Sequence, residues 1–272
     1  MKRYVAFIDI LGFKGIVNSY KGKINDLGEK LSQIFNASIY SAITGEDTKV
    51  GIQPGELPND ILFYQFSDSV ILYTKDDSDN ARDKMVLTLN YLLARSALQG
   101  FPLRGGLVKE ELYAKPPILV GEGIIKAYGL EMKQEWSGVI VHKDCYTLLD
   151  YETTDIANKL IARFKVPVKD DTDVPVKSDN IIQVKGEDGI LTEEHLVINW
   201  PQFVGMRVNS REHFKECLTK ETGIPSKKKD IAKIENTLNF FEQNIGYAQL
   251  PSLVFTGAIL RGGRYILNSQ KE

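Results

Sequence analysis

The sequence predicts an α+β fold, in which a ferredoxin-like βαββαβ unit carries its helices on one face of the sheet. Two observations support this. Short apolar runs typical of strands alternate with segments whose apolar residues recur at steps of three and four, and over residues 1–148 they follow the order β-α-β-β-α-β, then a further helix and strand. The chain has 272 residues, 43% hydrophobic and 26% charged, a composition typical of soluble globular proteins.

The first strand is expected at residues 4–10, "YVAFIDI", a short run of β-branched and aromatic residues that predicts burial on both faces. The glycines of "LGFKG" then indicate a turn. A helix should follow, because apolar residues recur at helical spacing in the next segment: Leu27, Leu31, Ile34, Phe35 and Ala42.

A hairpin and a second long helix come next. Residues 61–66 and 70–74 are apolar and are separated only by Ser67-Asp68-Ser69, which predicts two strands joined by a tight turn. The stretch "DDSDNARDKMVLTLNYLLARSALQG" predicts an amphipathic helix. We expect Asp79 or Asn80 to cap this helix and Gly100 to end it.

The rest of the first unit should contain a strand in "FPLRGGLVKEELYA", a short helix in "VGEGIIKAYGLE" and a strand in "SGVIVHK". Residues 149–272 are predicted to form a C-terminal α/β extension that stabilises a dimer or regulates the protein. Its expected elements are a strand in "EEHLVINWPQF", helices in "SREHFKECLTKE" and "KKKDIAKIENTLNFFEQN", and a terminal hairpin from "SLVFTGAIL" and "RYILN". The polar, proline-containing "FKVPVKDDTDVPVKSDN" should be irregular.

Composition excludes several classes of function. The formal net charge of −2 gives no basic excess for binding nucleic acid. Cys145 and Cys217 lie far apart without a CxxC motif, so neither a zinc site nor a disulfide scaffold is expected. No apolar run approaches the roughly 18 residues of a membrane span. Asp9 and the lack of a small-residue cleavage site argue against a signal peptide. We therefore expect a cytoplasmic protein with neither a membrane nor a nucleic acid as partner.

Two carboxylates stand where the predicted topology would bring them together. Asp9 ends the first strand, and Asp68 lies in the hairpin turn beside that strand. A charge in so apolar a run costs several kcal/mol unless it is compensated. Two converging carboxylates repel each other unless cations lie between them, and Mg²⁺ or Mn²⁺ suits oxygen ligands. Two such ions about 4 Å apart would hold the attacking and leaving oxygens of a phosphoryl transfer.

The loop after Asp9 predicts an anion site. Backbone N–H groups of Leu11, Gly12 and Phe13 would point from a helix start toward a phosphate. Together with the two carboxylates, this loop predicts a site for a nucleoside triphosphate. The alternative is that Asp9 caps the helix and Asp68 is an ordinary turn residue.

The motifs "FIDILGF" and "FSDS" resemble the catalytic domain of class III nucleotidyl cyclases, and in detail the pyrimidine nucleotide cyclases of Pycsar antiphage defence. "LRGGL" and "VGEGIIKAYGLE" fall where that family has its RGG strand and AYxLE-type helix, so the resemblance covers roughly residues 3–145. It implies that Asp9 and Asp68 carry two divalent ions, Mn²⁺ or Mg²⁺, with the backbone carbonyl of Ile10 as a further ligand. The ribose 3′-oxygen would then attack the α-phosphate, giving a 3′,5′-cyclic nucleotide and pyrophosphate.

Two positions depart from the class pattern. Purine cyclases of this class carry Lys or Glu four residues before the second Asp, whereas this chain has Tyr64, which favours UTP or CTP over purines. The preference for UTP over CTP comes from the family resemblance alone. Tyr64 as a core aromatic is the alternative. The class's helix Asn and Arg align with Ile125 and Gly129. Arg104 is a candidate substitute cation, or else an ordinary ion-pair partner.

The resemblance also implies partners. Class III domains build their sites across a dimer interface, so a homodimer with composite sites is expected, together with a separate effector protein that responds to the cyclic nucleotide. Glu122 and Glu131 are expected on a solvated helix face, and the alternative for Glu131 is a contact with ribose or with a partner subunit. The alternatives left open are a degenerate cyclase-fold module that binds a nucleotide without turnover, and a purine cyclase.

Overall fold

The structure is a computed structural model that describes residues 1–44, 60–115, 117–147, 152, 160–170, 182–187, 189–204, 208, 210–245, 260–261 and 264–265. Its strands are β1 (Lys2–Ile10), β2 (Ile61–Phe66), β3 (Ser69–Thr74), β4 (Leu103–Glu111), β5 (Tyr113–Lys115), β6 (Ile118–Val120), β7 (Val139–Val141), β8 (Ile161–Pro167), β9 (Val184–Lys185), β10 (Leu191–Ile198), β11 (Leu260–Arg261) and β12 (Arg264–Tyr265). Its helices are α1 (Phe13–Ser19), α2 (Ile24–Thr44), α3 (Asp79–Leu98), α4 (Glu122–Lys133), α7 (Pro201–Val204), α8 (Arg211–Thr219) and α9 (Lys228–Ile245).

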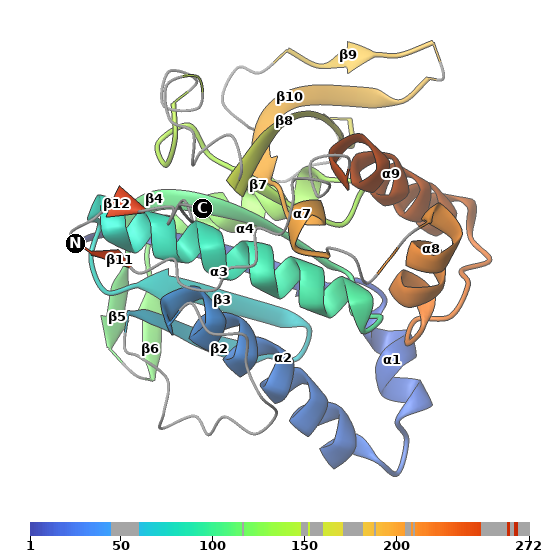
Figure 1. The fold of residues 1–272 in the computed structure, drawn as a ribbon, viewed down its shortest axis with the longest axis horizontal. Coiled ribbons are helices and arrows are strands. Elements are labelled where there is room, and N and C mark those ends of the chain that lie inside the picture. The colour runs from blue at the N-terminus through green and yellow to red at the C-terminus, as the bar shows by residue number, and fades with distance from the viewer. Residues whose placement is uncertain are drawn as a thin grey trace, which may run out of the picture.

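The predicted α+β class and its ferredoxin-like strand order are confirmed. The described strands form an eight-stranded sheet in the order β2-β3-β1-β4-β7-β10-β8, with β9 paired to β10. The part β4-β1-β3-β2 is antiparallel, and β1 is central because it pairs with both β3 and β4. The helices α2 and α3 lie side by side over this sheet, as Figure 1 shows.

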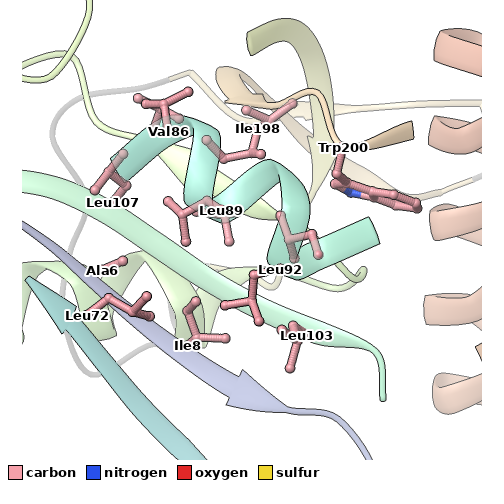
Figure 2. Close-up of a cluster of buried hydrophobic side chains, with 14 of the residues drawn as sticks. Ala6, Ile8, Leu72, Val86, Leu89, Leu92, Leu103, Leu107, Ile198 and Trp200 are labelled. Carbon is pink, nitrogen blue, oxygen red and sulfur yellow. The ribbon is translucent and has the colours of Figure 1, made fainter. Parts of the chain in front are cut away.

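The main core lies between α3 and one face of the sheet. Ala6 and Ile8 of β1 point toward Leu89 of α3, and neighbouring strands add further apolar side chains (Figure 2). All of the labelled side chains in this cluster are buried: Ala6, Ile8, Leu72, Val86, Leu89, Leu92, Leu103, Leu107, Ile198 and Trp200. Because side chains alternate along a strand, Val5, Phe7 and Asp9 face the other side of the sheet.

That other side is covered by α4, the helix that follows the βαββαβ unit, whereas the two long helices of the unit, α2 and α3, share one face as predicted. The ring of Phe7 meets the ring of Tyr128 edge to face at 5.3 Å. A Cβ atom on Gly106 would lie 2.5 Å from Leu130 Cβ and 2.6 Å from the carbonyl of Ala127. The second glycine of "LRGG" therefore lets the helix approach the sheet closely, a contact that periodicity within the helix does not reveal.

The cap of α3 is one residue earlier than predicted. Neither Asp79 nor Asn80 is the N-cap; Ser78 is, with an extended backbone and an Oγ that accepts a hydrogen bond from the N–H of Ala81 at 3.2 Å. At the other end the prediction is confirmed, because Gly100 directly follows the C-cap residue with φ at +85°.

The extension continues the same sheet. The "FKVP" of the segment expected to be irregular belongs to β8, where buried Phe164 and Val166 alternate with exposed residues and the strand pairs antiparallel with β10. The polar residues that alternate with Phe164 and Val166 made this strand, buried on one face only, look irregular in the sequence. The helices α8 and α9 and the strand β10 lie where predicted. Of the expected terminal hairpin, the structure describes only β11 and β12, which pair antiparallel, and the rest of "SLVFTGAIL" and "RYILN" lies outside the described residues. The division at residue 148 stays a prediction; none of the described helices is long and apolar enough to cross a membrane.

A buried charged group ties α4 to β10. The carboxylate of Glu193 accepts hydrogen bonds from Lys133 at the end of α4 and from His195 (2.7 Å) on its own strand. Burial alone would raise the pKa of Glu193, but these two bonds, the positive charge of Lys133 and a hydrogen bond from Gln183 outweigh it and hold the pKa at about 2. The end of α4 is therefore fixed to the extension as well as to the sheet.

We expect Gly106→Ala to destabilise the protein by about 1–3 kcal/mol, because the added methyl group would overlap Leu130 and the backbone of α4. Gly28→Ala is the matched control. A Cβ at Gly28, within α2, meets nothing within 4 Å, so this change should stabilise the protein by about 0.5–1 kcal/mol. Urea unfolding measures both changes. Equal stability of the two variants would contradict the close packing of α4.

Candidate active site

The structure brings Asp9 and Asp68 to the same end of the sheet, as the topology predicts. Asp9 is opposite Ser69 of β3, and the N–H of Ile10 donates a hydrogen bond to the backbone carbonyl of Asp68 at 2.9 Å. The turn is tight because Ser67 adopts a left-handed backbone conformation, with φ at 58°. The backbone of the β2–β3 turn is thus fixed directly beside the end of β1.

The carboxyl group of Asp9 lies in an unfavourable environment for a negative charge. Burial, together with the nearby charges of Glu131 and Asp68, raises its pKa to about 6, although the positive charge of Arg104 opposes the rise. A group placed so that its charged form is disfavoured is a candidate functional group.

Arg104 supports Asp9 from the neighbouring strand. Its Nε donates to Glu131 at 2.6 Å, its Nη1 donates to the backbone carbonyl of Gln134 at 2.9 Å, and its Nη2 lies 3.9 Å from Asp9 Oδ2. The residue is only 7% exposed. Of the two readings of Arg104 offered by the sequence, the ion-pair partner matches this geometry, so a role in catalysis would be exerted through Asp9.

Glu131 is the residue of this site that the sequence did not reveal. The prediction of a solvated face is correct for Glu122, which is exposed, but wrong for Glu131, which is 2% exposed. A signal was present: Ala127, Leu130 and Glu131 share helical spacing and lie on the stripe that faces the sheet. Burial raises the pKa of Glu131, while its bonds to Arg104 lower it.

The glycine loop supplies fewer donors than predicted. The N–H of Leu11 donates to the carbonyl of Pro102 at 2.9 Å, so it is not available to a phosphate, and Gly12 and Phe13 provide the remaining N–H groups. Gly12 itself is the N-cap of α1, and no side chain caps this helix. The alternative that Asp9 caps the helix is therefore wrong. Gly12 has φ at +75° and lies under Thr222, whose Cγ2 would be 3.1 Å from an added Cβ.

The remaining predicted residues are placed as follows. Tyr64 is partly buried and stacks on Tyr73 with ring centroids 6.3 Å apart, and the register of β2, β3 and β1 puts it on the same face of the sheet as Asp9. On α4, Ile125 is 53% exposed and Gly129 is buried. These two positions offer no polar side chain. The use of the Ile10 carbonyl as a metal ligand stays a prediction.

The donor set at Asp9 fits a hard divalent cation. Among the described residues, His, Cys, Asp and Glu nowhere gather in groups of three that could hold a metal ion. Mg²⁺ does not need such a group, because it commonly takes one or two carboxylates and completes its shell with water and substrate phosphates. Asp9 is partly buried, Glu131 and Asp68 lie close by, and Arg104 is already bound to Glu131. The negative charge at Asp9 is therefore one that a cation would offset.

Comparisons with known proteins add little. No protein-family model matches the chain, and no curated protein does. Among solved structures, the chain is similar to the catalytic core of a rhodopsin-guanylyl cyclase with converted specificity in complex with ATPalphaS. The identity is 14%, the match covers 72% of this chain and 94% of that chain, and the TM-score is 0.43. At this level the similarity carries no argument about what this chain does.

Proposed function

We propose that this chain is a divalent-metal-dependent nucleotidyl cyclase that converts a pyrimidine nucleoside triphosphate, UTP in preference to CTP, into its 3′,5′-cyclic monophosphate and pyrophosphate. The observation that carries the proposal is the position of Asp9 at the end of β1, directly beside the turn that holds Asp68. The proposal includes a homodimer with composite sites. It also includes a signalling role in antiphage defence through a separate effector protein, as the sequence motifs imply.

The residues of the site have distinct roles in this proposal. Divalent ions held by Asp9 and Asp68 would offset the charge of the triphosphate and favour ionisation of the ribose 3′-hydroxyl. Arg104, fixed by Glu131, orients Asp9. The N–H groups of Gly12 and Phe13 would donate hydrogen bonds to phosphate oxygens.

The test is to incubate the purified protein with each of the four ribonucleoside triphosphates and Mn²⁺, and to identify products by mass spectrometry. We expect cyclic UMP from UTP, less cyclic CMP from CTP, and equimolar pyrophosphate. If none of the four yields a cyclic product, the enzyme proposal is wrong. A purine product would support a purine cyclase instead and would contradict the role given to Tyr64.

Tyr64 is expected to select the smaller base. Its ring, on the Asp9 face of the sheet, would fill the volume of the second ring of a purine. We expect Tyr64→Ala to shift the ratio of kcat/KM for UTP over ATP by about tenfold or more toward ATP. Tyr64→Phe is the control, because it keeps the volume and removes only the hydroxyl. An unchanged ratio in Tyr64→Ala would rule out this role.

The second candidate function is a cyclase-fold module that binds a nucleotide without turnover. The observation that favours it is the apolar pair Ile125 and Gly129 on α4, where the class has Asn and Arg. Calorimetric titration separates the two functions: the module would bind a nucleoside triphosphate and return it unchanged, whereas the enzyme would release pyrophosphate.

A further inference from the structure

Two lysines of the C-terminal part meet at one carboxylate beside α4. Glu135 follows this helix, and its two oxygens lie 3.9 Å from Lys169 Nζ and 3.9 Å from Lys233 Nζ. All three side chains are partly exposed, Lys233 by 21%. The group of Glu135, Lys169 and Lys233 is therefore reachable from solvent, unlike Arg104.

The helix α9 places Lys233 near the end of β1. Asn236 donates to the carbonyl of Glu135 at 2.8 Å, and Thr237 accepts from the N–H of Ser137 at 2.8 Å. Ser137 in turn donates to the carbonyl of Leu103, which is opposite Ile10 in the sheet. A short chain of contacts thus connects α9 to the strand end that carries Asp9.

The charges agree with this placement. Lys233 is one of the positive groups that lower the pKa of Asp9, and both Lys169 and Lys233 lower that of Glu131. The pKa of Lys169 is itself lowered, first by burial and then by the positive charge of Arg104, with Lys233 adding to the effect. Three cationic side chains therefore crowd one end of the sheet.

The ammonium group of Lys233 is only weakly engaged within the chain. Its carboxylate neighbours, Asp230 and Glu135, lie at 3.5 and 3.9 Å, distances at which partly exposed pairs contribute little. Lys169, by contrast, donates to the carbonyl of Met132. Lys233 can therefore exchange its neighbours for a more highly charged anion at small cost.

We propose that Lys233 binds the phosphate groups of the nucleotide that occupies the Asp9 site, and that Lys169 adds positive charge beside it. This inference rests on the proposed function. It gives the extension a part in the active site of its own chain, because α9 supplies a cation there. The helix α4 supplies none at the two positions where the class has Asn and Arg, since these are Ile125 and Gly129. The phosphate-binding charge then depends on how α9 docks against Glu135 and Ser137.

The test compares Lys233→Gln, Lys233→Arg and Lys229→Gln. Lys229 is an exposed lysine near the start of the same helix and serves as the matched control. The measurements are kcat and KM for UTP, and the dissociation constant of a UTP analogue without the 3′-hydroxyl, by calorimetry with Mn²⁺. We expect Lys233→Gln to raise both KM and the dissociation constant about tenfold or more, as for loss of a hydrogen bond to a charged group. Lys233→Arg should restore most of the binding, and Lys229→Gln should match the wild type.

The outcomes separate this inference from the proposed function. If the wild type forms cyclic product and Lys233→Gln binds the analogue within twofold of it, Lys233 has no part in phosphate binding and only this inference fails. The same holds if Lys229→Gln weakens binding as much as Lys233→Gln. If the wild type neither forms a cyclic product nor binds the analogue, the proposed function fails, and this inference fails with it.

Discussion

Asp9→Asn is expected to lower turnover by about a thousandfold or more while leaving the folded protein as stable as the wild type, or more stable. The loss follows because the amide is a poor metal ligand and the charge developing on the phosphate loses its stabilisation. Stability should not fall, because the change removes a partly buried negative charge close to Glu131 and Asp68 while keeping the size of the side chain. Steady-state kinetics with Mn²⁺ and thermal unfolding of the metal-free protein measure the two effects.

Asp68→Asn should cause a similar loss of turnover, since Asp68 stands beside the same strand end. Asp26→Asn is the control: this carboxylate is exposed on α2 and has no part in the site. If either Asp9→Asn or Asp68→Asn keeps most of the wild-type activity, the assignment of the two carboxylates is wrong. A marked drop in the stability of Asp9→Asn would instead indicate that Asp9 has a structural role.

The second large effect is expected at the buried pair of Arg104 and Glu131. Arg104→Met leaves the carboxylate of Glu131, which is 2% exposed, without its cation, and should lower the free energy of unfolding by about 3–5 kcal/mol. Asp9 loses the same support, so kcat should fall as well. Because Arg104 acts on substrate only through Asp9, its loss should change kcat more than KM.

A double-mutant cycle measures the coupling in this pair. Glu131→Leu alone leaves the guanidinium of Arg104 buried and should also be strongly destabilising. The combined variant Arg104→Met/Glu131→Leu should be clearly more stable than the sum of the two losses predicts, because no buried charge is left unpaired. Urea unfolding of the four proteins provides the values. Simple additivity would show that the two side chains do not depend on each other.

The meeting of Asp9 and Asp68 could be predicted because few alternatives exist. The sequence predicts a strand that is buried on both faces, a tight hairpin and two helices long enough to cover a sheet. With these elements, the hairpin can hardly pair anywhere other than beside that strand. The order of elements places the hairpin beside β1, and only Ser67 and Asp68 lie between β2 and β3, which leaves Asp68 little freedom. Local sequence patterns were thus enough to predict that Asp9 and Asp68 lie close together, because the pairing of neighbouring strands determines their positions.

Features that depend on distant contacts could not be predicted in this way. The burial of Glu131 follows from the face of the sheet on which α4 docks, and that docking depends on Gly106 in another element. Lys233 approaches the site through hydrogen bonds to residues a hundred positions earlier in the chain. The engagement of the Leu11 N–H by Pro102 is equally non-local. Such contacts leave no periodicity in the segment itself.

The claim on which the other inferences depend is that the end of β1 and the β2–β3 turn hold divalent ions. Electron paramagnetic resonance titration of Mn²⁺ tests it, in the presence of the UTP analogue that lacks the 3′-hydroxyl. The wild type should bind two Mn²⁺ ions per site, and Asp9→Asn and Asp68→Asn should each bind fewer or bind them at least about tenfold more weakly. Unchanged binding of Mn²⁺ in both variants would show that Asp9 and Asp68 do not hold the ions.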